Sequence, residues 1–329
     1  MHMKKNIILT SLFICSLISH AQISGGMIQR STQKSSVTTE SSKTTIKKKP
    51  SSSTSKTQAK HSASKRYKQG KSYTDPYPIE YADTIVGDMG GDIDPEQFYQ
   101  WGLEDYNKNN YGEAKEWFEL AVQTGNHVNA AFYLGCIYYD GMGVSANHAE
   151  AFRYFKISGF SNNCIAQWYV GYMLAEGSGV QKDERKADLW YHKALSNLFE
   201  LAKDALEADD ELALQFLLMA SIPKNTPYEG PALSLLGYLY YYGKCGVKQD
   251  YYQAFDYFSR AENVGSLPAK YYLGLCYEFG HGVKESKSMA KKMYKASGYD
   301  NWSNAFYIMK NPVIPSSWTN MWISNYQLD

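Results

Sequence analysis

The chain of 329 residues has few long hydrophobic runs, and none after residue 21 approaches the length of a membrane span. A transmembrane helix needs about 20 consecutive apolar residues. The one marked apolar run, residues 7–18, follows two lysines and leads to a small-residue exit at Ala21, which is typical of a cleaved secretory signal. We therefore expect residues 1–21 to be a signal peptide. We also expect the mature protein to be exported, to the periplasm, the cell surface or the medium, with no membrane span.

Motifs of common catalytic sites are also missing. The chain has no Gly-x-Ser-x-Gly nucleophile turn, no phosphate-binding loop and no dinucleotide fingerprint. Histidines are few, and those beyond the first hundred residues lack a partner at His-x-x-x-His spacing: His127, His148, His192 and His281. The acidic cluster from Glu200 to Glu211 suits a solvated helix face and a helix cap better than a cation site. We expect no catalytic residue, no metal and no cofactor.

Cysteine is scarce, and one of the five lies inside the expected signal peptide. An even number remains in a protein that we expect to be exported, which would permit disulfides. The four stand at unrelated places in the repeat described below, so that helices in register would hold them too far apart to bridge: Cys136, Cys164, Cys245 and Cys276. We therefore expect free and mostly packed thiols.

Acidic residues are rare between the signal and the repeats. Residues 22–80 carry 12 Lys and Arg against 3 Asp and Glu, whereas residues 81–329 carry 20 against 30. The segment is rich in Ser, Thr and Lys and cannot bury enough apolar surface to fold, so we expect residues 22–94 to be a disordered linker. Because export argues against nucleic acid as a partner, its charge would instead meet anionic envelope surfaces. The simpler interpretation is a solvated tether.

Glycine follows a strict order in the rest of the chain. A hydrophobic residue and a glycine are followed six residues later by a second glycine and then by Gly-Val. Four copies begin at Gly135, Gly171, Gly237 and Gly274. A fixed period of this kind indicates stacked supersecondary units.

Each unit is predicted to be a pair of amphipathic helices. Alanines stand five residues before the first glycine and eight after the Gly-Val glycine, and apolar residues recur between them at helical spacing. Glycine suits the left-handed end of the first helix. The second helix then begins after a residue that can cap it: Asn147, Asp183, Asp250 or Ser286. Aromatic or bulky pairs in the second helices, such as Tyr154-Phe155, are expected to fill the seam between units.

The pattern from Ala166 to Ala194 resembles the Sel1-like repeat family, a relative of the tetratricopeptide repeat. Segments around Gly102–Ala121 and Leu201–Ala220 fit the shorter tetratricopeptide spacing. The resemblance implies an all-α fold, a right-handed α/α superhelical solenoid of about six helix-turn-helix repeats over residues 95–311. Residues 302–310 are predicted to form a helix that caps the open end, and residues 312–329 stay unassigned.

The resemblance further implies that the first helices line a concave face. Aromatic residues are frequent at the positions expected there: Phe132, Tyr139, Trp168, Tyr172, Tyr238, Tyr241, Tyr242, Tyr271 and Phe279. Such rings offer broad apolar area at a small entropic cost. We expect a non-catalytic scaffold or adaptor that binds a protein or peptide in an aromatic groove. The alternatives are a glycan or peptidoglycan-fragment binding module, a less favoured cell-envelope hydrolase, and rings that only stack between repeats.

Overall fold

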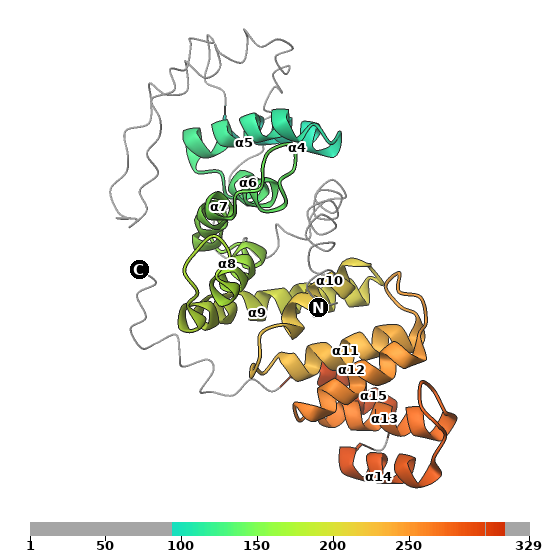
Figure 1. The fold of residues 1–329 in the computed structure, drawn as a ribbon. Helices are drawn as coiled ribbons and strands as arrows, with labels where there is room; N and C mark the ends of the chain where they lie inside the picture. Colours follow the sequence, from blue (N-terminus) through green and yellow to red (C-terminus); the bar gives the residue numbers. More distant parts are fainter. Residues whose placement is uncertain (1–93, 300, 313–329) are drawn as a thin grey trace, which may run out of the picture. The chain divides into compact units, whose positions relative to one another are not determined.

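The computed structural model describes residues 94–299 and 301–312, which form twelve α-helices and no strand. The predicted signal peptide, all but the last residue of the predicted linker, and residues 313–329 lie outside this part, so those predictions stay untested. The chain divides into two compact units, with the division between Trp190 and Tyr191. Each unit is described by itself (Figure 1).

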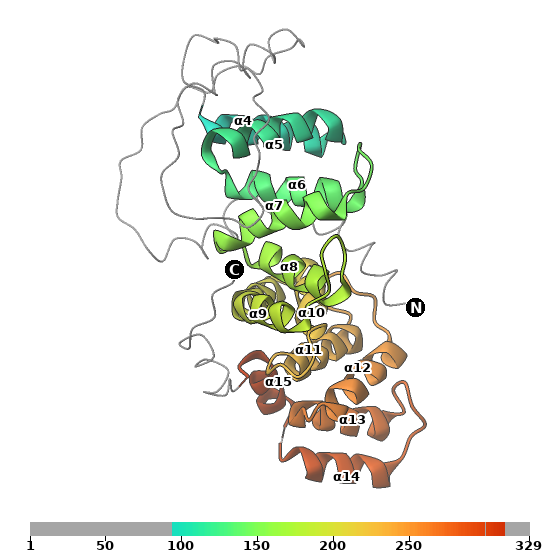
Figure 2. The same ribbon diagram turned by 60° about the vertical axis from the view of Figure 1, so that its left-hand side comes forward.

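Unit 1 is a series of antiparallel helices, of which the first five pack one on the next (Figure 2). Its helices are α4 (Pro95–Asn107), α5 (Tyr111–Gly125), α6 (Val128–Asp140), α7 (His148–Phe160), α8 (Cys164–Glu176) and the start of α9 (Glu184–Glu207). Unit 2 begins within α9. It holds α10 (Leu212–Ser221), α11 (Glu229–Tyr242), α12 (Tyr251–Asn263), α13 (Leu267–Phe279), α14 (Lys287–Ser297) and α15 (Trp302–Lys310). From α10 to α14, each helix of this unit packs on the next. The predicted all-α repeat fold is confirmed.

Two predicted repeat units share one helix. The sequence pattern assigns Ala194 to one copy and Leu201 to the next unit, but α9 runs unbroken for 24 residues through both positions. No glycine or proline lies between these two positions to end a helix. Leu195, Leu198 and Phe199 in this stretch are all buried, so packing favours the continuous helix.

Close contact within each hairpin depends on the repeat glycine. A Cβ atom added to Gly135 of α6 would lie 2.5 Å from the ring of Phe155 on α7. The same ring also stacks on Tyr169 of α8, with the ring centroids 4.5 Å apart. Glycine, ring and tyrosine thus form one layered contact from a first helix, through its partner, to the next first helix.

The same layering recurs elsewhere in both units. In unit 1, the Phe118 ring lies on Gly102 and stacks on Tyr133 with centroids 5.2 Å apart. In unit 2, the Phe258 ring lies on Gly237 and stacks on Tyr272 at 5.0 Å. The expectation that second-helix rings fill the seams between hairpins is confirmed for these residues.

The inter-helix turns follow the glycine pattern. Gly141, Gly177, Gly243 and Gly280 end their helices in the left-handed conformation. The following turn glycine has another role, since a Cβ atom on Gly179 would lie 2.2 Å from the backbone of His148 at the start of the preceding second helix. Gly282 meets Tyr251 in the same way at 2.0 Å. These glycines therefore permit a backbone contact between successive hairpins as well as a turn.

All four predicted caps are confirmed. Asn147, Asp183, Asp250 and Ser286 each accept a hydrogen bond from a backbone N–H group in the first turn of the helix that follows. Asp210 accepts from Leu212 N at the start of α10. Asp209, predicted to share this capping role, accepts instead from Cys245 N in the turn of the next hairpin.

The predicted thiols are free and buried at Cys164, Cys245 and Cys276. Burial raises the pKa of each of the three to about 12. Cys136 is disulfide-bonded, so the expectation of a free thiol is wrong at that position.

We expect Gly135→Ala to lower the free energy of unfolding by about 1–3 kcal/mol, because the buried Phe155 ring has no room to move away from a methyl group. Gly112→Ala is the matched control. Gly112 is exposed on α5 with nothing within 4 Å of an added Cβ atom, so the change should stabilise by up to about 1 kcal/mol. Urea unfolding followed by circular dichroism measures both. Equal effects of the two substitutions would contradict the packing assignment.

Buried thiols should resist alkylation in the native protein. We expect Cys164 and Cys276 to stay unmodified by iodoacetamide at about pH 8, because the reactive species is the thiolate and burial raises both pKa values to about 12. Both should react fully in guanidinium chloride. Peptide mapping by mass spectrometry assigns the sites, and labelling of either cysteine in the native protein at the rate of free cysteine would disprove the assignment.

Candidate interaction surface

The nine aromatic residues predicted to bind a partner all lie on the first helices of hairpins. They come from α6 and α8 in unit 1, and from α11 and α13 in unit 2. We call the surface formed by these helices within each unit the first-helix face. The structure divides the nine residues by exposure.

Three of the nine lie inside the packing. Phe132 and Trp168 are each 2% exposed, and Tyr241 is 7% exposed. Phe132 contacts the Phe155 ring within its own hairpin, with the centroids 5.9 Å apart. Side chains buried to this extent contribute mainly to the core, and they support rather than form a contact surface.

Tyr139 and Tyr172 of unit 1 are half-buried. Tyr139 stacks on His148 with the centroids 5.0 Å apart and meets the edge of Tyr169. Tyr172 stacks in parallel on Trp168 at 5.3 Å. Both rings are therefore held in place by neighbouring rings, and each keeps part of its surface in solvent.

Unit 2 holds the most exposed members of the set. Phe279 is 58% exposed and Tyr242 is 40% exposed. Tyr238, half-buried, lies against Tyr242 with the centroids 4.7 Å apart. Tyr271 is also half-buried and contacts Tyr294 of α14. The face in unit 2 thus combines a supported ring cluster with exposed rings.

A histidine adjoins this cluster where the turn follows α13. His281 Nδ1 lies 2.8 Å from the Tyr241 hydroxyl, and the His281 ring stacks on Tyr251 with the centroids 3.9 Å apart. Phe279 also contacts the imidazole, at 5.6 Å. Desolvation lowers the pKa of His281 below its ordinary value. The ring therefore acts as a packing element that is favoured in its neutral form.

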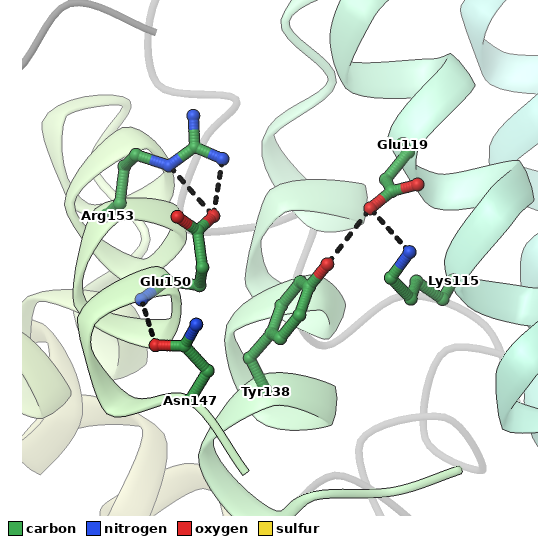
Figure 3. Close-up of polar contacts among 6 residues, drawn as sticks. All are labelled: Lys115, Glu119, Tyr138, Asn147, Glu150 and Arg153. Atoms are coloured by element: carbon green, nitrogen blue, oxygen red, sulfur yellow. Dashed lines mark hydrogen bonds and ion pairs between the residues drawn. The ribbon is translucent and has the colours of Figure 1, made fainter. Parts of the chain in front are cut away.

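Charged side chains in unit 1 are used differently, as Figure 3 shows. Glu119 of α5 receives the Tyr138 hydroxyl at 3.1 Å and the Lys115 ammonium at 2.9 Å. Arg153 of α7 donates two hydrogen bonds to the Glu150 carboxylate. The backbone N–H of Glu150 donates to the side chain of Asn147, the cap of the same helix. These charges pair with one another between and along helices, so they build no cluster that aims at a ligand.

Three further aromatic residues of unit 2 were not among the predicted ones, and one of them, Phe306, contacts the first-helix face. Phe306 of α15 lies 4.5 Å from Tyr238, centroid to centroid, and Tyr307 and Tyr252 are 64% and 78% exposed. Phe306 falls outside the repeat pattern, so no spacing rule points to its contact. Tyr252 lies on a second helix, where the resemblance implies no binding role.

Metal-ligating side chains do not gather in the part of the chain that the structure describes. No group of three or more His, Cys, Asp or Glu among the described residues could hold a metal ion. Glu278 precedes His281 by three residues, the spacing of helical metal ligands, but Glu278 accepts from the Tyr294 hydroxyl while His281 contacts Tyr241. Among the helices of residues 94–299 and 301–312, none has both the length and the apolar character to cross a bilayer.

The neutral His281 predicts a pH dependence. The folded chain protonates this ring less readily than the unfolded chain, whose histidine titrates near 6.5. The stability that results is fully present above about pH 6.5 and is lost as the pH falls through the lower folded pKa. We expect the difference in free energy of unfolding between wild type and His281→Phe to shift in favour of the variant between about pH 7.5 and 5. Urea titrations at both pH values measure it, and a shift toward the wild type at low pH would contradict this account.

The chain is also similar to two proteins of known crystal structure. A Sel1 repeat protein from Oxalobacter formigenes is 26% identical, and the match covers 64% of this chain and 75% of that one with a TM-score of 0.31. The protein c5321, a protective antigen present in uropathogenic Escherichia coli strains and displaying an SLR fold, is 23% identical. That match covers 69% of this chain and 52% of the other, with a TM-score of 0.35.

Five stretches match the Sel1 repeat: residues 89–126, 128–159, 164–197, 230–266 and 267–299. The last four are the predicted full copies, and the first contains the segment that the sequence assigned to the shorter tetratricopeptide spacing. The stretch that includes α10 is not among the matches. Because the matched residues make up more than half of the sequence, the chain belongs to the Sel1 repeat family.

Proposed function

We propose that this protein is an exported, non-catalytic adaptor that holds a protein or peptide partner on its aromatic first-helix face. Sel1 repeat solenoids are typical protein-interaction scaffolds, and the family is generally non-catalytic. The observation that carries the proposal is the ring cluster of unit 2, where exposed Tyr242 packs against half-buried Tyr238 and exposed Phe279 contacts His281. Exposed apolar rings on a firm support are common at interaction sites.

Export is supported by the signal-like start of the sequence, and places the protein in the periplasm, on the cell surface or in the medium. The basic segment of residues 22–94 would then tether the repeats and contact anionic envelope surfaces. Protein partners are favoured over a glycan because Tyr242 meets Tyr238 at 51° and Tyr241 at 66°, so that these rings form no single flat platform on which a sugar ring could stack.

Alanine at both exposed rings, Tyr242→Ala with Phe279→Ala, should abolish most partner binding. Loss of two interface aromatics costs about 2 kcal/mol or more, a fall in affinity of about 30-fold or greater. Thermal unfolding should change only modestly, because Phe279 is 58% exposed and Tyr242 is 40% exposed. Crosslinked capture from an envelope extract, quantified by mass spectrometry, measures the loss for each identified protein.

Tyr252→Ala provides the matched control, because Tyr252 is 78% exposed but lies on the second helix α12. It should leave the captured proteins unchanged. Partners that persist in the folded double variant, or that are lost equally with the control, would reject the first-helix face as the site. Sedimentation with insoluble peptidoglycan, lost only in the double variant, would favour the glycan alternative instead.

A further inference from the structure

The C-terminal helix occupies a place that the repeat pattern does not predict. Residues 302–310 form the predicted helix, α15, but α15 packs mainly against α11 and α13 (Figures 1 and 2). These are both first helices, so α15 lies on the first-helix face of unit 2. The prediction that it caps the open end of the array is therefore wrong in its placement. The apolar side of α15 packs against α11, where Phe306 contacts the ring of Tyr238.

Contacts of α15 define what this face accepts. Ala305 is 0% exposed and Met309 is 1% exposed, while the Phe306 ring lies 4.5 Å from the Tyr238 ring of α11. Lys310 forms an ion pair with Glu207 near the end of α9. The four side chains recur at helical spacing on one side of α15. Tyr307, 64% exposed, marks the opposite side.

A helix of this length is not stable alone. Isolated helices shorter than about 12 residues are marginal in water, and α15 has nine residues. Its own stabilising feature is the Asn301 cap, which accepts from Asn304 N at 3.0 Å. The packed residues therefore supply most of the stability, which means that the α11–α13 face selects and holds a short amphipathic helix.

We infer that the α11–α13 face of unit 2 is a helix-binding surface and that α15 is its resident occupant. The partner segment would be a short amphipathic helix with a small residue, an aromatic residue next to it, an apolar residue four positions after the first, and then a lysine. The small residue takes the fully buried place of Ala305, and the lysine meets the largely solvated carboxylate of Glu207. Such a segment replaces α15. This inference rests on the proposed function and specifies its partner.

The test uses the full chain and a fluorescein-labelled peptide of residues 301–312. In wild type the peptide competes with a tethered copy of itself, so binding is weak because the tethered copy has a high effective concentration. Met309→Asp in the chain places a charge at a buried position and releases α15. We expect fluorescence anisotropy to show at least tenfold tighter peptide binding to this variant. Tyr307→Ala in the chain is the matched control and should behave as wild type, since that ring faces away.

Specificity is tested by changing the face and the peptide. In the Met309→Asp chain, adding Tyr238→Ala should reduce peptide binding at least tenfold. Adding Glu207→Lys should weaken the binding of the natural peptide. A peptide with Lys310→Glu should bind this chain with the affinity that the natural peptide lost. A peptide carrying Phe306→Ala and Met309→Asp should not bind. Recovery by charge exchange would not follow from nonspecific apolar association.

Three results would overturn the inference. The first is equal peptide binding to wild type and to the released variant. The second is binding that ignores the Tyr238 and Glu207 changes. The third is loss of cooperative unfolding in Met309→Asp together with helix content lost far beyond α15, because α15 would then be part of the core. If the peptide fails but capture still depends on Tyr242 and Phe279, only the helix inference falls. If capture also ignores those rings, the proposed function falls with it.

Discussion

The fold depends on aromatic rings held between a glycine and a tyrosine. Phe155 lies on Gly135 of its own hairpin and stacks on Tyr169 of the next, and Phe118 and Phe258 repeat this arrangement. Because the glycine has no side chain, the ring of the second helix lies directly on the backbone of the first helix. The same ring stacks on a tyrosine of the following hairpin. A single layered interaction therefore joins the helices within a hairpin and joins hairpins within each unit.

The turns reinforce the same spacing. Gly179 and Gly282 each press against the backbone at the start of the preceding second helix, where any side chain would collide. Side-chain caps such as Asp250 begin the second helices at a constant distance from the glycines. Because turn, cap and ring contact agree on one register, local and tertiary preferences support each other.

Aromatic side chains serve two purposes on the first helices. Some, such as Phe132, are buried in the core, while others on the same kind of helix, such as Phe279, are exposed to solvent. The buried rings pack the helix in place, so that the exposed rings can form an apolar surface at no cost to the core. In unit 2 part of that surface is covered by α15, whose Phe306 and Lys310 reach Tyr238 and Glu207. The protein thus carries on its own chain a segment matched to its aromatic face.

Local rules in the sequence determined the repeat, its helix boundaries and its caps, because a left-handed glycine and a capping side chain act within a few residues of their position. They also placed the nine candidate rings on the first helices. They did not determine the continuous α9, in which buried Leu195 and Leu198 join two predicted units in one helix.

Tertiary packing alone decided which rings are buried, since Tyr241 and Tyr242 are neighbours in the sequence but differ in exposure. It also decided where α15 lies. The spacing of apolar residues in a sequence shows which side of a helix is apolar, but it does not show which other helices that side packs against.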